Sequence, residues 1–135
     1  MQIKKYTFQP HGDSRGQLVA LEEMKDIPFK IKRVYYMYDT TEGVTRGYHA
    51  HKNLQQILIC VKGSCKIRLD NGSEKEIVLL DKPYEGLYVS NKMWREMFDF
   101  SPDAVLMVLA SEYYDESDYI RSPLKISPQK QRNMV

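Results

Sequence analysis

Two of the three histidines in this 135-residue chain stand two positions apart, at His49 and His51. Alternate side chains of a β-strand share a face, so a strand through this segment presents both imidazoles side by side. Imidazoles placed in this way can bind a metal ion or exchange protons near neutral pH. Arg46 lies three residues before His49 and adds a cation. The segment therefore predicts either a metal site or proton-transfer chemistry.

The composition is that of an ordinary globular domain. The chain is 42% hydrophobic and 28% charged, and its net charge of +2 is too small to indicate nucleic-acid binding. It contains no apolar run of membrane-spanning length and does not begin with the apolar stretch of a signal peptide. We therefore expect a cytoplasmic protein without a membrane span. Cys60 and Cys65 match no zinc spacing, and we expect both to be small buried residues without a disulfide.

Short β-rich segments separated by turn residues run through the chain. They cover residues 17–22, 31–38, 47–51, 55–62, 65–69, 74–80, 86–90, 94–100 and 105–110. The sequence Asp70-Asn71-Gly72 predicts a tight hairpin, because Asn-Gly tolerates positive φ. Helix is expected only in short pieces, around Asn53 and within residues 115–119. The pattern predicts an all-β sandwich or barrel. It forms a single domain over residues 1–121, followed by an extended or partly disordered tail over 122–135.

The surroundings of the histidines resemble the first motif of the cupin superfamily, through Gly43, His49, His51, Gln56 and Gly63. That motif has a glutamate where this chain has Gln56, and a histidine of the second cupin motif stands where this chain has Arg95. The resemblance implies a cupin jelly-roll barrel of short antiparallel strands with little helix.

These two replacements make a poor metal site. The neutral amide of Gln56 is a weak ligand, and the permanently charged guanidinium of Arg95 repels a cation. We therefore expect no metal ion, and general acid–base catalysis by His49 and His51 becomes the leading interpretation. Arg95 would then stabilise developing negative charge. A structural role for both histidines, with their hydrogen bonds satisfied within the fold, is the alternative.

Longer segments resemble enzymes of nucleotide-sugar metabolism. Asp13-Ser14-Arg15-Gly16 and Arg46-Gly47-Tyr48-His49 are similar to motifs of the dTDP-4-dehydrorhamnose 3,5-epimerases. Residues 27–29, 31–36, 46–52, 86–89, 94–97 and 108–121 resemble the dTDP-4-dehydro-6-deoxyglucose 3,4-ketoisomerases still more closely. The match to this second family runs to Arg121, and its last segment is long and unusual.

The resemblance implies an isomerase that acts on a dTDP-linked 4-keto-6-deoxy sugar in deoxysugar biosynthesis. A base removes the C3 proton beside the ketone, an enediol(ate) forms, and protonation at C4 gives the 3-keto sugar without a redox cofactor or a metal. The implied catalytic residues are His49 as the base, His51 as a proton relay and Tyr35 as a hydrogen-bond donor. The implied substrate-binding residues are Arg15, Arg33, Arg46 and Arg95. The C4 configuration of the product stays open between galacto and gluco, and Arg95, as a poor proton carrier, inclines the expectation toward the gluco product.

Three other functions stay open at this point. A 3,5-epimerase would need a second proton donor that serves C5. A nucleotide-sugar-binding cupin would bind without turnover, and a metal-dependent cupin oxygenase would need the ligands that Gln56 and Arg95 replace. The resemblance also implies a homodimer. Its N-terminal strand is a candidate for exchange between the two copies, because exposed strand edges gain from being covered.

Overall fold

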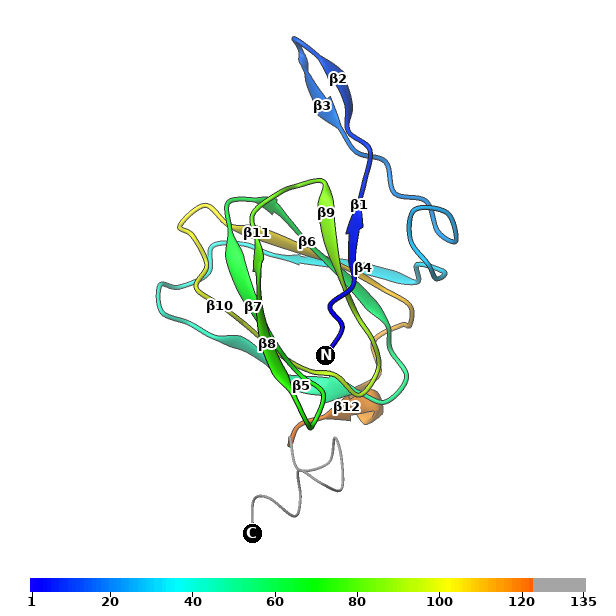
Figure 1. Ribbon diagram of the computed structural model, residues 1–135, viewed down its shortest axis with the longest axis vertical. Coiled ribbons are helices and arrows are strands. Elements are labelled where there is room, and N and C mark those ends of the chain that lie inside the picture. The colour runs from blue at the N-terminus through cyan, green and yellow to red at the C-terminus, as the bar shows by residue number, and fades with distance from the viewer. Residues whose placement is uncertain (123–135) are drawn as a thin grey trace.

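The computed structural model describes residues 1–122, and these form two five-stranded antiparallel sheets that enclose a barrel (Figure 1). The first sheet has the order β1 (Lys5–Thr7), β9 (Glu85–Val89), β6 (Gln56–Lys62), β11 (Val105–Ala110) and β4 (Arg33–Met37). The second has the order β12 (Tyr119–Ile120), β5 (Arg46–His51), β10 (Trp94–Phe98), β7 (Cys65–Asp70) and β8 (Lys75–Leu80). The strands β2 (His11–Asp13) and β3 (Gly16–Leu18) form a separate hairpin, and a 3-10 turn, η1 (Glu116–Asp118), precedes β12. No helix within the described residues is long and apolar enough to cross a membrane.

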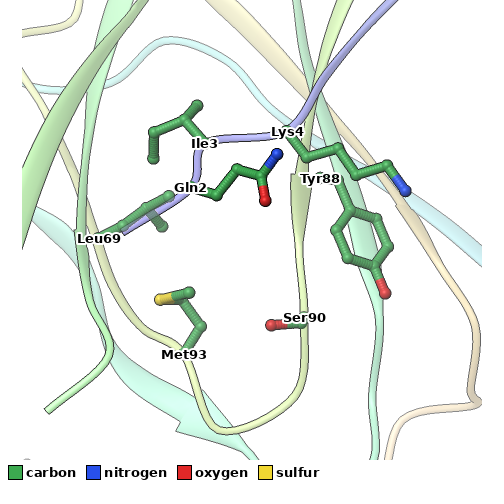
Figure 2. Close-up of a pocket in the computed structure, with 7 residues that line it drawn as sticks. All are labelled: Gln2, Ile3, Lys4, Leu69, Tyr88, Ser90 and Met93. Carbon is green, nitrogen blue, oxygen red and sulfur yellow. The ribbon is translucent and has the colours of Figure 1, made fainter.

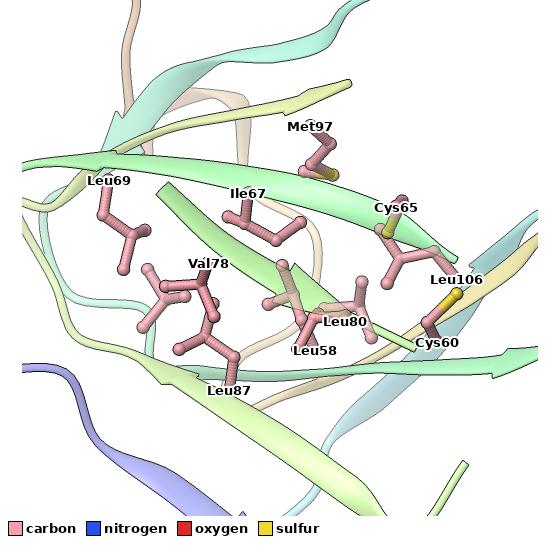
Figure 3. Close-up of a cluster of buried hydrophobic side chains, with 12 residues drawn as sticks. Leu58, Cys60, Cys65, Ile67, Leu69, Val78, Leu80, Leu87, Met97 and Leu106 are labelled. Carbon is pink, nitrogen blue, oxygen red and sulfur yellow. The ribbon is translucent and has the colours of Figure 1, made fainter. Parts of the chain in front are cut away.

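Apolar side chains from both sheets pack against one another inside the barrel (Figure 3). The buried set is Leu58, Cys60, Cys65, Ile67, Leu69, Val78, Leu80, Leu87, Val89, Met97, Leu106 and Val108. Burying one Leu or Ile side chain contributes about 1.5–3 kcal/mol, so this cluster supplies much of the force that holds the sheets together. Both cysteines lie within it as free thiols, as predicted.

The central strands of the first sheet are covered on both faces. Leu106 and Val108 point into the barrel core, whereas Leu109 packs in a second cluster on the outer face with Phe8, Ile27, Phe29, Ile57 and Ile59. This arrangement explains why β6 and β11 read as continuous apolar runs rather than as alternating strands.

Several local predictions are confirmed. The hairpin at residues 70–72 joins β7 to β8, where Asp70 pairs with Lys75 and Gly72 has a φ of 99°. The helical turn expected within residues 115–119 is η1, whose N-cap Asp115 accepts a hydrogen bond from the Ser117 amide.

Other local predictions are wrong. No helix forms at Asn53, because its backbone N–H donates to the carboxylate of Asp118, 2.9 Å away, rather than to a local carbonyl. The strand expected over residues 17–22 ends at Leu18, where the hairpin ends. The strands β1, β2 and β12 were not predicted, and the tail from residue 123 onward lies outside the described residues.

β5 departs from regular alternation just before the histidines. Its register against β10 pairs His49 with Arg95 and Gly47 with Glu96, so Tyr48 is the extra residue of a β-bulge. Gly47 and Tyr48 both have positive φ, at 93° and 55°. Alternation resumes after the bulge, and the histidines share a face as predicted.

Gly47→Ala is expected to destabilise the protein and to displace the histidines. An added Cβ would lie 2.9 Å from the Arg95 carbonyl oxygen, at a φ that side chains rarely adopt. Backbone strain of this kind costs about 1–3 kcal/mol, and the close contact adds to that loss. Gly43→Ala is the control, because Gly43 has a φ of 77° but nothing within 4 Å of its added Cβ. Urea unfolding measures the free energy of unfolding of both variants. An equal loss of stability in the two would contradict the close contact between the added Cβ and the Arg95 carbonyl oxygen.

Candidate active site

The two histidines lie against each other on the buried face of β5. Their ring centres are 4.8 Å apart, and their exposed fractions are only 8% and 1%. The ring of Tyr119 covers both, with its centre 5.0 Å from His49 and 4.4 Å from His51. Tyr119 reaches them because β12 pairs with β5, and Ile120 fixes that short strand by packing on Ala50 and Trp94. Tyr119 was not among the predicted residues, and a two-residue strand gives no sequence signal that would reveal it.

Two acceptors fix the tautomers of the imidazoles. Nδ1 of His49 lies 2.9 Å from the Gly47 carbonyl oxygen, and Nδ1 of His51 lies 3.1 Å from a carboxylate oxygen of Asp118. A carbonyl and an ionised carboxylate can only accept, so each ring donates from Nδ1 and keeps its lone pair on Nε2. Both Nε2 atoms are buried and have no hydrogen-bond partner within residues 1–122. The site therefore offers two unpaired basic nitrogens.

Burial keeps both imidazoles uncharged. It is the main cause that lowers the pKa of His49 to about 4, and Arg95 and Arg121 lower it too, against the hydrogen bond to Gly47. Burial also lowers the pKa of His51, with the charge of Arg95 as the next cause. At neutral pH both rings are therefore free bases.

Arg95 supplies a buried positive charge beside the histidines. Its exposed fraction is 0%, and its guanidinium donates to the carbonyl oxygens of Met93 at 2.7 Å and Ser90 at 3.4 Å, and to the side-chain oxygen of Gln56. Burial lowers the pKa of Arg95 to about 10, so the group is charged at neutral pH. The predicted cation is present, and protein acceptors hold it in place.

Tyr35 and Arg33 approach from the first sheet. Nε2 of Gln56 donates to the Tyr35 hydroxyl at 3.0 Å, and burial raises the pKa of Tyr35, so the phenol keeps its proton. The guanidinium carbon of Arg33 lies 5.1 Å from the centre of the Tyr35 ring, and its Nε is buried without a hydrogen bond within the described residues. Tyr36 points the other way and is 62% exposed, which confirms the predicted facing.

Two of the predicted arginines lie away from this group. Arg15 is in the β2–β3 hairpin, which projects from the barrel (Figure 1), and it pairs with Asp13 at 2.6 Å. Arg46 is exposed at the start of β5, before the bulge. The residues that this chain brings together are His49, His51, Tyr35, Arg33 and Arg95. Asp118 and Tyr119, which were not predicted, join them.

A separate hollow of about 340 Å³ borders the loop that holds Arg95. Figure 2 shows the N-terminal residues Gln2, Ile3 and Lys4 facing Leu69, Tyr88, Ser90 and Met93 around it. Its lining includes none of the predicted catalytic or binding residues, and Lys4 is the one charged side chain in that lining. The hollow is therefore a neighbour of the histidine site and not part of it.

The side chains around the histidines are poorly suited to a metal ion. Residues 1–122 contain no group of three or more His, Cys, Asp or Glu side chains that could hold one. The positions that complete a cupin metal site carry Gln56 and Arg95, which bond to each other. The donor chemistry favours an anion beside Arg95 over a cation.

Comparison with known proteins agrees with this chemistry. The model of the family described as "FdtA: WxcM-like, C-terminal" matches residues 1–129. The chain belongs to this FdtA family. It is 56% identical over 121 residues to the TDP-4-oxo-6-deoxy-alpha-D-glucose-3,4-oxoisomerase of Aneurinibacillus thermoaerophilus, across 90% of this chain and 87% of that protein.

Solved structures similar to this FdtA-family chain include QdtA, a sugar 3,4-ketoisomerase from Thermoanaerobacterium thermosaccharolyticum. Its complex with TDP has a TM-score of 0.91 and 47% identity, over 98% of this chain and 97% of that one. A mutant of QdtA in complex with TDP-4-keto-6-deoxyglucose has a TM-score of 0.91 and 46% identity, over 98% and 96% of the two chains. The predicted family and the predicted all-β cupin-like fold are both confirmed.

Arg95→Met is expected to raise the pKa of both histidines, because it removes a neighbouring positive charge that disfavours the imidazolium. A histidine base works while neutral, so activity is lost as the pH falls through its pKa. In the wild type that loss is expected near pH 4 for His49, well below the ordinary value of about 6.5. Histidine NMR titration and the pH dependence of kcat/KM measure the pKa, and Lys66→Met, which removes an exposed charge paired with Asp99, is the control. A wild-type histidine titrating near its ordinary value would contradict the expectation.

Proposed function

We propose that this protein is a TDP-4-keto-6-deoxyglucose 3,4-ketoisomerase, which moves the keto group of the sugar from C4 to C3. The observation that carries the proposal is the pair of unpaired, neutral Nε2 atoms beside a buried guanidinium and a protonated tyrosine. Base, cation and proton donor are the three parts that this isomerisation requires. The 56% identity to a curated 3,4-oxoisomerase supports the same reaction and substrate.

The first half of the reaction breaks the C3–H bond. Nε2 of His49 takes the C3 proton, which is acidic because C4 is a ketone. The electron pair forms a C3=C4 double bond and shifts the carbonyl electrons to O4, where negative charge develops. The Tyr35 hydroxyl donates to O4, and the charge of Arg95 stabilises it.

The second half rebuilds a carbonyl at C3. The O3 hydroxyl passes its proton to the O4 oxyanion, the resulting O3 oxyanion forms the C3=O bond, and the electron pair of the C3=C4 bond takes a proton at C4. His51 delivers this proton after accepting one from water, because its Nε2 carries none at neutral pH, and His49 returns the C3 proton to water. Oxidation at C3 and reduction at C4 balance within the sugar, so the reaction needs no external electron acceptor.

Arg33 and Arg46 are the proposed contacts for the diphosphate. A guanidinium binds phosphate through two parallel hydrogen bonds. The Nε of Arg33 has no hydrogen-bond partner within residues 1–122 and Arg33 lies next to Tyr35, so it can hold a phosphate near the sugar-binding residues.

His49→Asn is expected to lower kcat by about 10²–10⁴, the usual contribution of a positioned general base. The measurement is an NMR time course with TDP-4-keto-6-deoxyglucose in deuterated buffer. The wild type should form the 3-keto sugar with deuterium at C4 and none at C5. Lys66→Met, which removes an exposed charge paired with Asp99 outside the β2–β3 hairpin, is the control.

Other outcomes would replace the proposal. Deuterium at C5 would identify a 3,5-epimerase, and TDP binding without exchange at C3 would identify a binding protein. Near wild-type turnover by His49→Asn would remove His49 as the base.

We also propose that the protein is a homodimer with exchanged N-terminal arms. All residues of β2 and β3 are exposed, and Leu18 is 60% exposed. On β4, an edge strand of its sheet, Val34 and Tyr36 are 52% and 62% exposed. A projecting arm and an apolar edge strand suit a second copy of the chain. An exchanged arm would carry Arg15 to the partner copy.

Light scattering is expected to give twice the 15.9 kDa mass of the chain. Leu18→Glu should shift the population toward the single-chain mass, because it replaces an apolar side chain of the arm with a charged one. Tyr113→Glu is the control, since Tyr113 is 71% exposed and lies outside the arm. A monomeric wild type would contradict the dimer.

A further inference from the structure

We propose that Gln56 sets the direction of the hydrogen bond to Tyr35 and so keeps the phenolic proton available for the sugar. Gln56 is then a positioning residue for the ketoisomerase reaction, and the inference rests on that proposed function. The cupin motif has a metal-binding glutamate at the position of Gln56. In this chain the amide of Gln56 has a different role.

Arg95 decides which way the amide of Gln56 points. A guanidinium only donates hydrogen bonds, so the Gln56 atom that faces Arg95 is Oε1. Arg95 cannot turn aside easily, because the Met93 carbonyl oxygen accepts from its Nε at 3.2 Å and from a terminal nitrogen at 2.7 Å. Gln56 and Arg95 both have an exposed fraction of 0%, so water does not compete for this bond. The NH2 group of Gln56 is therefore directed toward Tyr35.

The NH2 group in turn decides which partner donates to Tyr35. Nε2 of Gln56 lies 3.0 Å from the Tyr35 hydroxyl oxygen, and an amide nitrogen cannot accept. The hydroxyl oxygen is thus the acceptor, and its own proton is not used in this hydrogen bond. Within residues 1–122 the Tyr35 hydroxyl makes no second hydrogen bond to the protein. The chain Arg95–Gln56–Tyr35 therefore ends in a donor that can point at O4 of the sugar.

A glutamate at position 56 would reverse the last bond. Its carboxylate would accept from Arg95 and would also accept from Tyr35, so the phenolic proton would be held by the protein. Glutamate and glutamine have nearly the same shape, and Arg95 would gain a charged partner. The amide and the carboxylate thus both satisfy Arg95, and only the amide leaves the tyrosine as a donor to substrate.

The neighbouring residue offers a matched control. The Tyr88 hydroxyl donates to Oε1 of Gln55 at 2.6 Å, so that phenol already gives its proton to the protein. A carboxylate at position 55 accepts in the same direction. Gln55→Glu therefore makes the same chemical change one residue away without reversing a hydrogen bond.

The test compares turnover with binding. Gln56→Glu is expected to lower kcat by about tenfold or more, with the KM for TDP-4-keto-6-deoxyglucose and the affinity for TDP close to wild type. Gln55→Glu should leave kcat, KM and the affinity for TDP unchanged. Tyr35→Phe should lose a similar factor in kcat, and the Gln56→Glu/Tyr35→Phe double variant should be no slower than Tyr35→Phe, because both changes remove the same proton.

Gln56→Met separates this role from a merely structural one. Methionine keeps the volume, removes both hydrogen bonds and leaves the Tyr35 proton free, so its kcat should exceed that of Gln56→Glu. If Gln56 only held Arg95, the order would be reversed, because glutamate still holds Arg95 and methionine does not. This reversed order would overturn the inference, as would wild-type kcat in Gln56→Glu.

A readout independent of turnover distinguishes failure of the inference from failure of the proposed function. The ring-carbon NMR signal of Tyr35 reports its pKa, which a carboxylate at position 56 should raise by holding the proton and adding negative charge. An unchanged pKa of Tyr35 in Gln56→Glu would overturn the inference even if the wild type isomerises the sugar. If the pKa of Tyr35 rises in Gln56→Glu but the wild type does not isomerise the sugar, only the proposed function is wrong and the inference stands.

Discussion

A guanidinium buried between the two sheets organises the site. Moving a charge such as that of Arg95 out of water costs several kcal/mol, and the protein offsets this cost with the carbonyl oxygens of Met93 and Ser90 and the amide of Gln56. All three acceptors are uncharged. The positive charge is therefore held in place without being cancelled, and its field acts on whatever lies beside it.

The histidines owe their chemistry to this field and to their burial. Both causes disfavour the imidazolium, so His49 and His51 are bases and not cations at neutral pH. The same field favours an oxyanion, which is the charge that develops when a proton leaves the carbon beside a ketone. Glutamate and histidine at positions 56 and 95 would resemble a cation-binding cupin site. Gln56 and Arg95 convert the same barrel into a site that stabilises negative charge.

Local sequence patterns were sufficient where the structure depends on local geometry. Strand alternation placed His49 and His51 on one face, and it separated Tyr35 from Tyr36. The chemistry of Gln56 and Arg95 already argued against a metal site. It did not predict the hydrogen bond between them.

Patterns failed where distant segments meet. Asp118 bonds to His51 across 67 positions of sequence, through a turn and a two-residue strand that carry no periodic signal. The same carboxylate accepts a hydrogen bond from the backbone N–H of Asn53, and the helical turn expected there does not form. The sequence likewise did not show where Arg15 lies, since nothing in residues 13–16 indicates that their hairpin projects from the barrel of its own chain (Figure 1).

The packing of β12 has an optical consequence. The chain has a single tryptophan, Trp94, and it is only 5% exposed beneath Ile120. Ile120 directly follows Tyr119, whose ring covers both histidines. Any movement that lifts β12 from the histidines also lifts Ile120 from the indole and lets water reach it. The fluorescence of this one residue therefore reports, without an added label, whether His49 and His51 are covered or open to a ligand.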